Sequence, residues 1–377
     1  MPELAASPPP GAPTVPVALE YDGGDMDCGS GLLLAITSRM RRIDQGEVLL
    51  LHTRERSVLA DLPAWARLAG HALIAVVDDA ADTAPGPWRL WIERGRTVTG
   101  ALDRSVAADV EYSSGAPAPV GTRLWLYSNF HCNLACTYCC AASSPRAEPR
   151  LMSVETAASA AEQFAQQGGR ELLVTGGEPF LHPDLGELVA RTAEHVPVTL
   201  LTNAMVYAQG RRREALESFD RDRVTLQISL DSAGPELHDR QRGAGSHRRA
   251  LEGIQLAREL DFRVRVATTY LPEDAPAAGD LHGTLADLGI AEEDRLIRPV
   301  AAEGYAEDGV EITLDSVEPE PTLTADGAWW HPVGVTNRHL RVADAPLPLE
   351  HVLDVVRDVV AVQAAAGSKG RSVFRCT

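Results

Sequence analysis

At residues 132–139 the chain reads Cys132-Asn133-Leu134-Ala135-Cys136-Thr137-Tyr138-Cys139. Three cysteines stand here at C-x3-C-x2-C spacing, and a tight loop of this kind aims three thiolates at one point. A cubane iron–sulfur cluster normally takes four protein thiolates, so three of them leave one iron open to another ligand. The spacing therefore predicts a 4Fe–4S cluster whose protein ligands are Cys132, Cys136 and Cys139.

A structural zinc site is the alternative interpretation of this loop. Zinc sites usually draw on two ligand pairs, often with histidine. His131 is adjacent to the first cysteine, but no second pair follows in the sequence. The spacing therefore favours the cluster over zinc and over a coincidental cysteine-rich turn.

Length and composition bound the class of protein. With 377 residues, 45% of them hydrophobic, the chain is long enough for two or three domains with large cores. Its formal net charge of −18 argues against a general nucleic-acid or anionic-membrane surface. We therefore expect neither nucleic acid nor a membrane as a partner.

The cysteines and the N-terminus indicate the compartment. Four of the six cysteines crowd into one loop, which is not the pattern of a secreted disulfide framework. Residues 1–14 are rich in Pro and Ala, lack the features of a signal peptide, and are expected to be disordered. No uninterrupted apolar run is long enough to span a bilayer. A reducing cytoplasm is the simplest location.

Residues 15–96 are predicted to form a small domain of their own. Apolar runs at 15–19, 47–52, 71–77 and 88–92 indicate strands, and helical spacing indicates helices at 33–43 and 57–69. The order β-α-β-α-β-β predicts a two-layer fold with both helices on one face of a sheet. Residues 97–121 have the composition of a linker.

Cys28 lies just before the first predicted helix of this domain. A thiol at that position meets the positive end of the helix dipole, which lowers its pKa and favours the thiolate. The alternative is an unreactive small residue in a turn. By position alone the unreactive residue is the favoured interpretation, and Cys28 becomes a candidate catalytic residue through the family resemblance given below.

Residues 122–301 alternate between strand and helix. Strands are predicted at 123–127, 171–175, 198–202, 224–230, 262–269 and 295–298, with helices at 154–167, 184–194, 247–260 and 279–288. Short apolar runs bounded by turn residues are typical of a parallel sheet wrapped by helices. Six such units predict an α/β fold of the partial (β/α)6 barrel type. In such sheets ligands bind at the carboxyl ends of the strands.

Two sets of residues stand at these strand ends. Gly176-Gly177-Glu178-Pro179 follows the second strand, where glycines allow a backbone to approach a ligand and Glu178 supplies an acceptor. By itself such a loop is more often an ordinary turn. Asn203, Ser229 and Asp231 stand at the ends of the next two strands, where short polar side chains can hydrogen-bond a ligand. Helix capping is the alternative role for such side chains.

Residues 302–377 are predicted to form a C-terminal cap. A hairpin is expected from 311–314 and 328–332, followed by a helix over 348–365. We expect Trp329, Trp330 and His331 to pack in the core rather than cover the barrel mouth. Cys376 is the one cysteine of this region. One thiol cannot hold a second iron–sulfur cluster, so we expect none in the C-terminal cap.

The cysteine motif, with an aromatic residue before its third cysteine, resembles the signature of the radical SAM (S-adenosylmethionine) superfamily. The Gly176-Gly177-Glu178-Pro179 loop resembles the motif that binds the SAM ammonium group. His238-Asp239-Arg240-Gln241-Arg242-Gly243 resembles an H-D-x-x-R-G segment of the branch that modifies peptides and cofactor precursors. Tyr138 is then implied to contact adenine through its backbone, and Arg242 to pair with a carboxylate of SAM or of the substrate.

This resemblance implies an enzyme with two cofactors, a 4Fe–4S cluster and SAM, in which the open iron binds SAM. The reduced cluster delivers an electron to SAM, and a 5′-deoxyadenosyl radical then abstracts hydrogen from a peptide or small-molecule substrate. An electron donor such as flavodoxin or ferredoxin is implied as a partner. The competing hypothesis is a non-catalytic or regulatory iron–sulfur or sulfur-binding module.

The first domain resembles the TusA sulfur-carrier family, over roughly residues 15–94. The resemblance rests on Asp27-Cys28-Gly29-Ser30-Gly31, Gln45-Gly46-Glu47, Asp61-Leu62-Pro63-Ala64-Trp65 and Gly70-His71. In that family a cysteine that opens the first helix carries a persulfide, and Cys28 falls on it, although the usual Cys-Pro-x-Pro is here Cys28-Gly29-Ser30-Gly31. The resemblance implies a sulfur relay through Cys28, loaded by a cysteine desulfurase.

Overall fold

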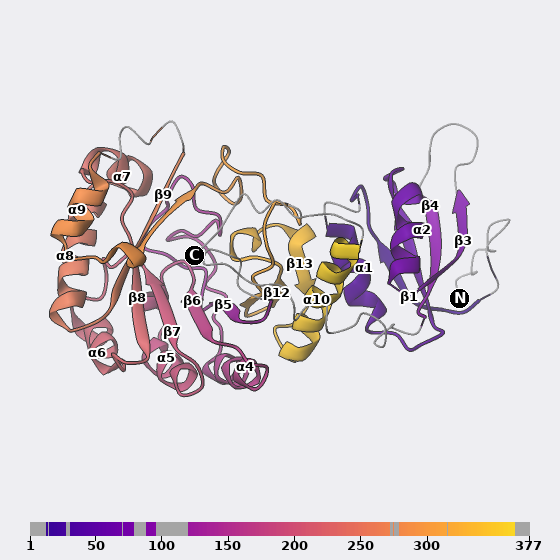
Figure 1. Cartoon of the computed structure of the whole chain (residues 1–377), viewed down its shortest axis with the longest axis horizontal. Helices are drawn as coiled ribbons and strands as arrows, with labels where there is room; N and C mark the ends of the chain where they lie inside the picture. Colours follow the sequence, from indigo (N-terminus) through magenta and orange to yellow (C-terminus); the bar gives the residue numbers. More distant parts are fainter. Residues whose placement is uncertain are drawn as a thin grey trace, which may run out of the picture. The chain divides into compact units, whose positions relative to one another are not determined.

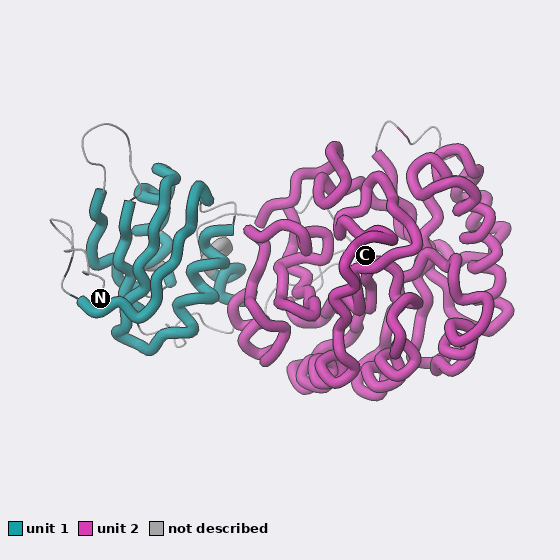
Figure 2. Tube along the Cα trace, turned by 180° about the vertical axis from the view of Figure 1, so that it is seen from behind, with its two compact units in different colours: residues 1–117, 357–369 teal, residues 118–356, 370–377 magenta. Residues whose placement is uncertain are grey.

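The chain divides into two compact units in this computed structural model. The structure describes residues 13, 15–27, 31–69, 71–78, 88–95, 120–271, 274, 279–314 and 316–365. Unit 1 comprises residues 1–117 and 357–369, and unit 2 comprises residues 118–356 and 370–377 (Figure 2). Cys28, Cys376, residues 1–12 and residues 97–119 of the predicted linker lie outside the described residues.

Unit 1 has the predicted element order. Its elements are β1 (Val17–Asp22), α1 (Leu33–Met40), β2 (Val48–Thr53), α2 (Val58–Leu68), β3 (Ala72–Asp78) and β4 (Trp88–Glu93). The four strands form one sheet in the order β1-β2-β4-β3, in which β1 and β2 are parallel and β4 is antiparallel to both of its neighbours. The sequence therefore predicted the secondary structure of this unit correctly.

The core of unit 1 lies between the sheet and its two helices. Ile36 of α1 and Leu62 of α2 pack in one buried cluster with Leu49, Leu51 and Leu90 of the sheet. Alternate residues of a strand face opposite sides, so these three leucines define one face and both helices cover it, as predicted. Each fully buried leucine contributes about 1.5–3 kcal/mol relative to an exposed one.

Unit 2 contains six parallel strands joined by helices. They are β5 (Arg123–Tyr127), α4 (Val154–Gln166), β6 (Glu171–Thr175), η2 (Pro179–Leu181), α5 (Leu185–Ala193), β7 (Val198–Thr202), α6 (Gly210–Ser218), β8 (Val224–Ser229), α7 (Pro235–Arg242), α8 (Ser246–Glu259), β9 (Val264–Tyr270), α9 (Leu281–Asp287), η4 (Glu292–Asp294) and β10 (Arg295–Pro299). Neighbouring strands pair in sequence order from β5 to β10, all parallel (Figure 1). This is the predicted mixed α/β fold with a parallel sheet.

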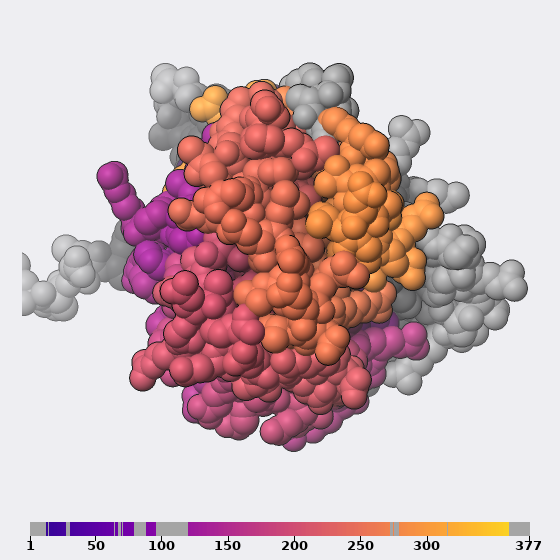
Figure 3. Space-filling view, turned by 90° about the vertical axis from the view of Figure 1, so that its left-hand side faces the viewer, coloured from indigo at the N-terminus to yellow at the C-terminus, as the bar shows by residue number. Residues whose placement is uncertain are grey.

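The two faces of this sheet carry different residues. Leu124, Leu172, Leu200, Leu226 and Val266 have no exposed surface and alternate along their strands with residues that line the pocket described below. The helices cover the apolar face, and α6 to α9 form the surface that faces the viewer in Figure 3. The opposite face encloses the barrel interior.

The C-terminal region extends the same sheet. β11 (Thr322–Thr324) pairs in parallel with β5, and β12 (Gly327–Trp329) and β13 (Arg341–Ala343) follow with antiparallel pairing. Further 3-10 turns (Pro332–Gly334 and Arg338–Leu340) separate β12 from β13, and α10 (Leu349–Ala365) ends the described chain. As predicted, Trp329, Trp330 and His331 are buried.

The predicted hairpin was wrong in its first strand, because β11 rather than residues 311–314 pairs with β12. The Ser316 hydroxyl donates to the carbonyl oxygen of Glu311 and accepts from the Thr313 N–H. These side-chain bonds close a turn, which takes residues 311–314 out of a strand ladder. Its apolar residues Ile312 and Leu314 are buried without being in a strand.

Charged side chains close the barrel at the amino ends of its strands. Glu171 at the start of β6 pairs with Arg123 of β5 at 3.3 Å and with Arg265 of β9 at 3.3 Å. Glu320, just before β11, bonds the Trp125 indole N–H and lies 3.8 Å from Arg123. These ion pairs lie at the end of the barrel opposite to the cysteine loop.

None of the helices in the described part of the chain is both long and apolar enough to cross a bilayer.

Candidate functional site

The cysteine loop lies at the carboxyl end of β5 and is clamped from several sides. The chain returns beside its own start, where the Cys132 N–H donates to the Ser144 carbonyl at 3.2 Å. The Thr137 N–H donates to the Gln241 carbonyl of α7 at 3.0 Å. The Tyr305 N–H, from the segment after β10, donates to the Cys139 carbonyl at 3.0 Å. The conformation of the cysteine loop is therefore fixed by its own end, by α7 and by the segment after β10.

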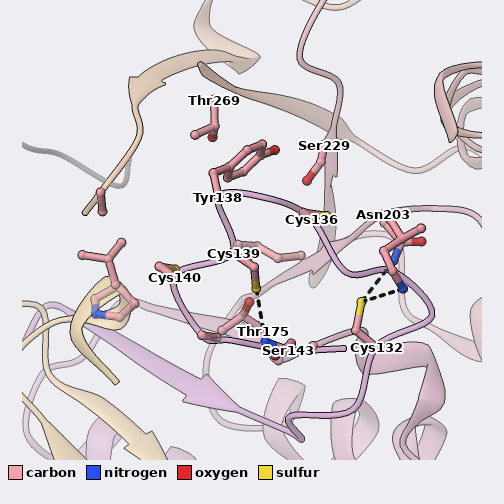
Figure 4. Close-up of a pocket in the computed structure, with 18 of the residues that line it drawn as sticks. Cys132, Cys136, Tyr138, Cys139, Cys140, Ser143, Thr175, Asn203, Ser229 and Thr269 are labelled. Carbon is pink, nitrogen blue, oxygen red and sulfur yellow. Dashed lines mark hydrogen bonds between the residues drawn. The ribbon is translucent and has the colours of Figure 1, made fainter. Parts of the chain in front are cut away.

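One pocket collects most of the predicted site residues (Figure 4). Its lining includes Cys132, Cys136, Tyr138, Cys139, Gly176, Gly177, Asn203, Ser229 and Arg242. They come from the ends of four neighbouring parallel strands and from α7. The structure thus brings these nine residues together at one edge of the sheet. Glu178, Pro179 and Asp231 are not part of the lining.

The environment of the thiols fits an iron cluster. Cys132 Sγ accepts hydrogen bonds from the Leu134 N–H at 3.4 Å and from Asn203 Nδ2 at 3.9 Å (Figure 4). Burial, with a smaller contribution from the Glu178 carboxylate, raises the pKa of Cys132 to about 12. Burial also raises the pKa of Cys136 to about 11. Buried thiols of this kind ionise when a cationic centre takes up the thiolates, as iron does.

The three thiols were predicted to point at one position. Among the residues that the structure describes, no group of three or more His, Cys, Asp or Glu side chains converges on one metal position. Zinc binds four ligands at about 2.0–2.3 Å in a tetrahedron. A cubane is held through separate iron atoms, so its thiolates surround a larger body.

Cys140 also lines the pocket, next to the third predicted ligand. Burial, with the neighbouring Cys139, raises its pKa to about 12. The Thr336 hydroxyl donates to the Cys140 carbonyl at 3.1 Å. Cys140 falls outside the C-x3-C-x2-C spacing, so we predicted that its thiol does not bind the cluster. This stays a prediction.

The two glycines after β6 have a different close neighbour from the one predicted. A Cβ on Gly177 would lie 2.2 Å from the His131 carbonyl oxygen, and one on Gly176 would lie 2.7 Å from the Asn129 carbonyl oxygen. The Glu178 N–H also donates to the His131 carbonyl at 2.9 Å. The glycines therefore admit the backbone that leads into the cysteine loop, and line the pocket in addition.

Glu178 lies behind the pocket rather than in its lining. Its carboxylate accepts from the Thr202 hydroxyl at 2.8 Å, the Asn203 N–H at 2.8 Å and the Phe180 N–H at 3.1 Å. The side chain has no exposed surface, and burial raises its pKa to about 7 against the effect of these donors. Its acceptors thus join the ends of β6 and β7, and its contact with a bound cofactor stays a prediction.

Asp231, Arg242 and Tyr138 form a buried hydrogen-bonded group. Arg242 binds Asp231 through two nitrogens, at 2.6 and 3.1 Å, and the Tyr138 hydroxyl donates to the same carboxylate at 2.7 Å. Burial alone would raise the pKa of Asp231, but the Arg242 guanidinium holds it below its ordinary value. The carboxylate that Arg242 was expected to bind is thus supplied by the chain itself.

The segment around α7 is held by its own polar residues. His238 Nδ1 accepts from the Asp231 N–H at 3.1 Å. The Asp239 carboxylate accepts from the Gly245 N–H at 2.7 Å and the His247 N–H at 2.8 Å, which caps the start of α8. Most of this motif therefore positions α7, and through Arg242 and Tyr138 it positions the cysteine loop.

Sequence reasoning did not select several residues of the pocket lining, among them Ser143, Thr175, Thr269 and Arg298. Thr175 is the last residue of β6, and Thr269 and Arg298 stand near the ends of β9 and β10. Arg298 Nε donates to the Thr269 hydroxyl at 3.1 Å. The signal that identifies them is their place at the carboxyl ends of predicted strands. Ser143 has no such signal.

The comparison with known families agrees with this geometry. Residues 127–276 match the sequence model of the Radical SAM superfamily. These residues form a radical SAM domain. Such domains belong to enzymes that depend on S-adenosylmethionine, and their cofactors are a 4Fe–4S cluster and SAM.

Several characterised proteins are similar to part of the chain. Mycofactocin maturase MftC of Mycobacterium ulcerans is 34% identical over 164 residues, which cover 42% of this chain and 42% of the relative. The antilisterial bacteriocin subtilosin biosynthesis protein AlbA of Bacillus subtilis is 32% identical over 162 residues, which cover 42% of this chain and 35% of the relative. The chain thus spans about two fifths of the length of these curated relatives.

A solved structure shows the same fold. Native anSMEcpe with bound AdoMet and Kp18Cys peptide has a TM-score of 0.50 and 12% sequence identity, over 64% of this chain and 82% of that chain. At this identity the likeness concerns the fold alone.

Proposed function

We propose that the chain cleaves SAM reductively and directs the resulting radical chemistry at a substrate held at the carboxyl end of the barrel. The observation that carries this proposal is the pocket itself, where three cysteines of one loop meet residues from four parallel strand ends. When bound, the cluster supplies one electron to SAM, which gives methionine and a 5′-deoxyadenosyl radical.

The residues of the chain have two kinds of role in this proposal. Cys132, Cys136 and Cys139 hold the cluster. Gly176 and Gly177 offer backbone, and Asn203 and Ser229 offer side-chain polar atoms, at the pocket surface where SAM is to bind.

The remaining residues act behind that surface. Asp231 orients Arg242 and Tyr138 at the pocket wall, and Glu178 with Pro179 supports the loop after β6. The pocket lies among the ends of the parallel strands, where a bound substrate is to be shielded from bulk water.

A peptide is the substrate class that we propose. Two relatives are named as a maturase and a bacteriocin biosynthesis protein, and the structure with a similar fold holds a peptide. Other relatives are named as an AdoMet-dependent heme synthase and a GTP 3′,8-cyclase, which keeps a small molecule as the second candidate. The electron for the cluster is proposed to come from a donor protein of the flavodoxin or ferredoxin type. The protein is proposed to work in a reducing cytoplasm.

The decisive experiment measures 5′-deoxyadenosine. Protein reconstituted anaerobically with iron and sulfide should bind about four irons per chain. With dithionite and SAM it should release 5′-deoxyadenosine without any substrate. Ala variants of Cys132, Cys136 or Cys139 should lose both properties, and Cys140→Ala should keep both. Four irons without any 5′-deoxyadenosine would favour the regulatory iron–sulfur module.

We further propose that unit 1 is a TusA-like sulfur carrier that relays sulfur through Cys28 to the substrate. Its order of elements and the placement of both helices on one sheet face support this. A cysteine desulfurase and labelled cysteine should load sulfur onto Cys28, as seen by mass spectrometry. If Cys28 takes up no label and Cys28→Ala leaves product formation unchanged, unit 1 acts in docking and not in sulfur transfer.

A further inference from the structure

Ser143 carries a buried hydroxyl to which the candidate site, as described so far, gives no role. The residue is 2% exposed and lines the pocket, four positions after the last predicted ligand. Within the described part of the chain, its Oγ is enclosed and has no hydrogen-bond partner. A buried hydroxyl without a partner is unfavourable, so its presence calls for a specific acceptor.

The position of Ser143 indicates what that acceptor is. Its backbone N–H already donates to Cys139 Sγ at 3.4 Å, and Figure 4 shows Ser143 between Cys139 and Cys132 at the base of the pocket. Ser143 thus lies beside two of the thiols that are predicted to hold the cluster. Cys132, Cys136 and Cys139 would hold the cluster in the pocket that Ser143 also lines. Cluster sulfurs are the acceptors that such a cluster would supply there.

We propose that the Ser143 hydroxyl donates a hydrogen bond to a sulfur of the cluster and thereby raises its reduction potential. The inference rests on the proposed function, because it needs the cluster to be bound. Reduction adds one electron from a low-potential donor and makes or breaks no bond. A hydrogen-bond donor stabilises the more negative, reduced form more than the oxidised form, and hydrogen bonds to sulfur are among the factors that set such potentials.

A neighbouring serine provides a matched control. The Ser144 hydroxyl accepts from the Arg146 N–H at 3.3 Å, and Ser144 is not part of the pocket lining. The contacts that Ser144 makes to the start of the loop use its backbone carbonyl. Ser144→Ala therefore removes a hydroxyl from the same loop without removing a donor to the cluster.

The test is a redox titration of the reconstituted full-length protein, followed by electron paramagnetic resonance of the reduced cluster. In Ser143→Ala we expect the ratio of reduced to oxidised cluster at a fixed potential to fall about tenfold, which is about 59 mV for one electron. Ser144→Ala should titrate like the wild type. Ser143→Thr, which keeps a hydroxyl, should return toward the wild-type potential.

A second readout detects the hydrogen directly. After exchange into D2O, deuterium coupled to the reduced cluster should be weaker in Ser143→Ala than in wild type or Ser144→Ala. An unchanged potential and coupling in Ser143→Ala with about four irons bound overturns the inference. Loss of iron in Ser143→Ala also overturns it, since the hydroxyl then serves the fold of the loop. If the wild type itself binds no cluster, the proposed function has failed instead.

Discussion

At the scale of single residues, the charged groups of this site serve one another before they serve a ligand. Asp231 is fully buried and accepts from Arg242, Tyr138 and the Thr269 N–H. Glu178 is equally buried and accepts hydrogen bonds from Thr202, Asn203 and Phe180. Among the described residues, the pocket lining itself contains no carboxylate; it combines the thiols and small polar side chains with apolar and aromatic residues, Arg242 and Arg298. The charged residues therefore preorganise the site, which is the condition for binding without reorganisation.

Gly177→Ala tests the contact between the loop after β6 and the cysteine loop. The added Cβ would meet the His131 carbonyl oxygen at 2.2 Å, and a backbone oxygen next to Cys132 can retreat only if the cysteine loop moves. We expect a loss of about 1–3 kcal/mol in the free energy of unfolding and a reduced iron content. Iron analysis and visible absorption after reconstitution measure the second effect.

Gly186→Ala is the control for this change. It lies inside α5, and a Cβ there would have its nearest neighbour at 3.7 Å. Alanine is favoured over glycine in a helix by about 1 kcal/mol, so this variant should gain stability and keep its iron. If Gly177→Ala binds iron as well as Gly186→Ala does, the close contact does not position the cysteine loop.

His238 predicts a pH dependence of stability. Burial, with the nearby Arg242 charge, lowers its pKa to about 4, and its Nδ1 accepts from the Asp231 N–H only when it is neutral. The folded-state pKa lies below the usual value of about 6.5, so this contribution is present above pH 6.5 and is lost as the pH falls. Between pH 6.5 and 5.0 the loss from this group should be about 2 kcal/mol.

His238→Asn separates this group from all others that titrate. The Asn side-chain oxygen still accepts a hydrogen bond but does not gain a proton in this range. Urea unfolding of both proteins from pH 5.0 to 7.5 should show a shallower decline for the variant. Parallel curves for the two proteins would mean that His238 is not held neutral by the fold.

At the scale of secondary structure, elements with a regular apolar pattern were predictable and polar ones were not. The predicted strands at 123–127, 171–175 and 198–202 agree with β5, β6 and β7 residue for residue. No range was predicted for α6 or α7. α6 has a single buried residue, Leu216, and α7 buries mainly His238 and Gln241 beside Leu237. Their polar sequences carry no amphipathic period from which a helix could be predicted.

The same contrast applies to the site. The predicted cysteines, glycines, Asn203 and Ser229 do line the pocket, because strand ends of a parallel sheet share one edge. Which carboxylates face a ligand and which face the protein was not predictable, since it depends on contacts between α7 and the cysteine loop. No local pattern encodes the Tyr138 bond to Asp231, which joins residues 93 positions apart.

Asp231→Asn tests whether α7 is fixed by its buried ion pair. The change leaves Arg242 charged in a buried position, and loss of one partner of such a pair typically costs about 3–5 kcal/mol. Because Tyr138 loses the same acceptor, we expect weaker SAM binding as well, measured by calorimetry on reconstituted protein. The comparison is Arg240→Ala on the same helix, whose pair with Asp274 at 2.6 Å is more exposed.

Arg240→Ala should cost about 0–1 kcal/mol, as is usual for exposed ion pairs. Equal free energies of unfolding for Asp231→Asn and Arg240→Ala would mean that the buried pair does not hold α7.

At the scale of the whole molecule, the chain separates into one unit that carries the radical SAM domain and one that carries the candidate sulfur carrier. Each unit has its own sheet, and no strand of one sheet pairs with the other among the described residues. Cleavage of SAM needs only groups of unit 2 in our proposal, whereas sulfur transfer needs both units. The two activities should therefore be separable by dissection of the chain.

A fragment of residues 118–377 tests this separation. It keeps the six parallel strands, the cysteine loop, β11 to β13 and all of α10, although the part of α10 beyond residue 356 groups with unit 1. We expect the fragment to bind about four irons and to release 5′-deoxyadenosine at the rate of the full chain. The fragment should unfold at a lower temperature than the full chain. Val359 is buried and belongs to the part of α10 assigned to unit 1, so removal of residues 1–117 takes away residues of the same unit. A folded fragment that binds iron but no longer cleaves SAM would show that unit 1 takes part in the radical step itself, and a relay of sulfur alone would then be too narrow a role for it.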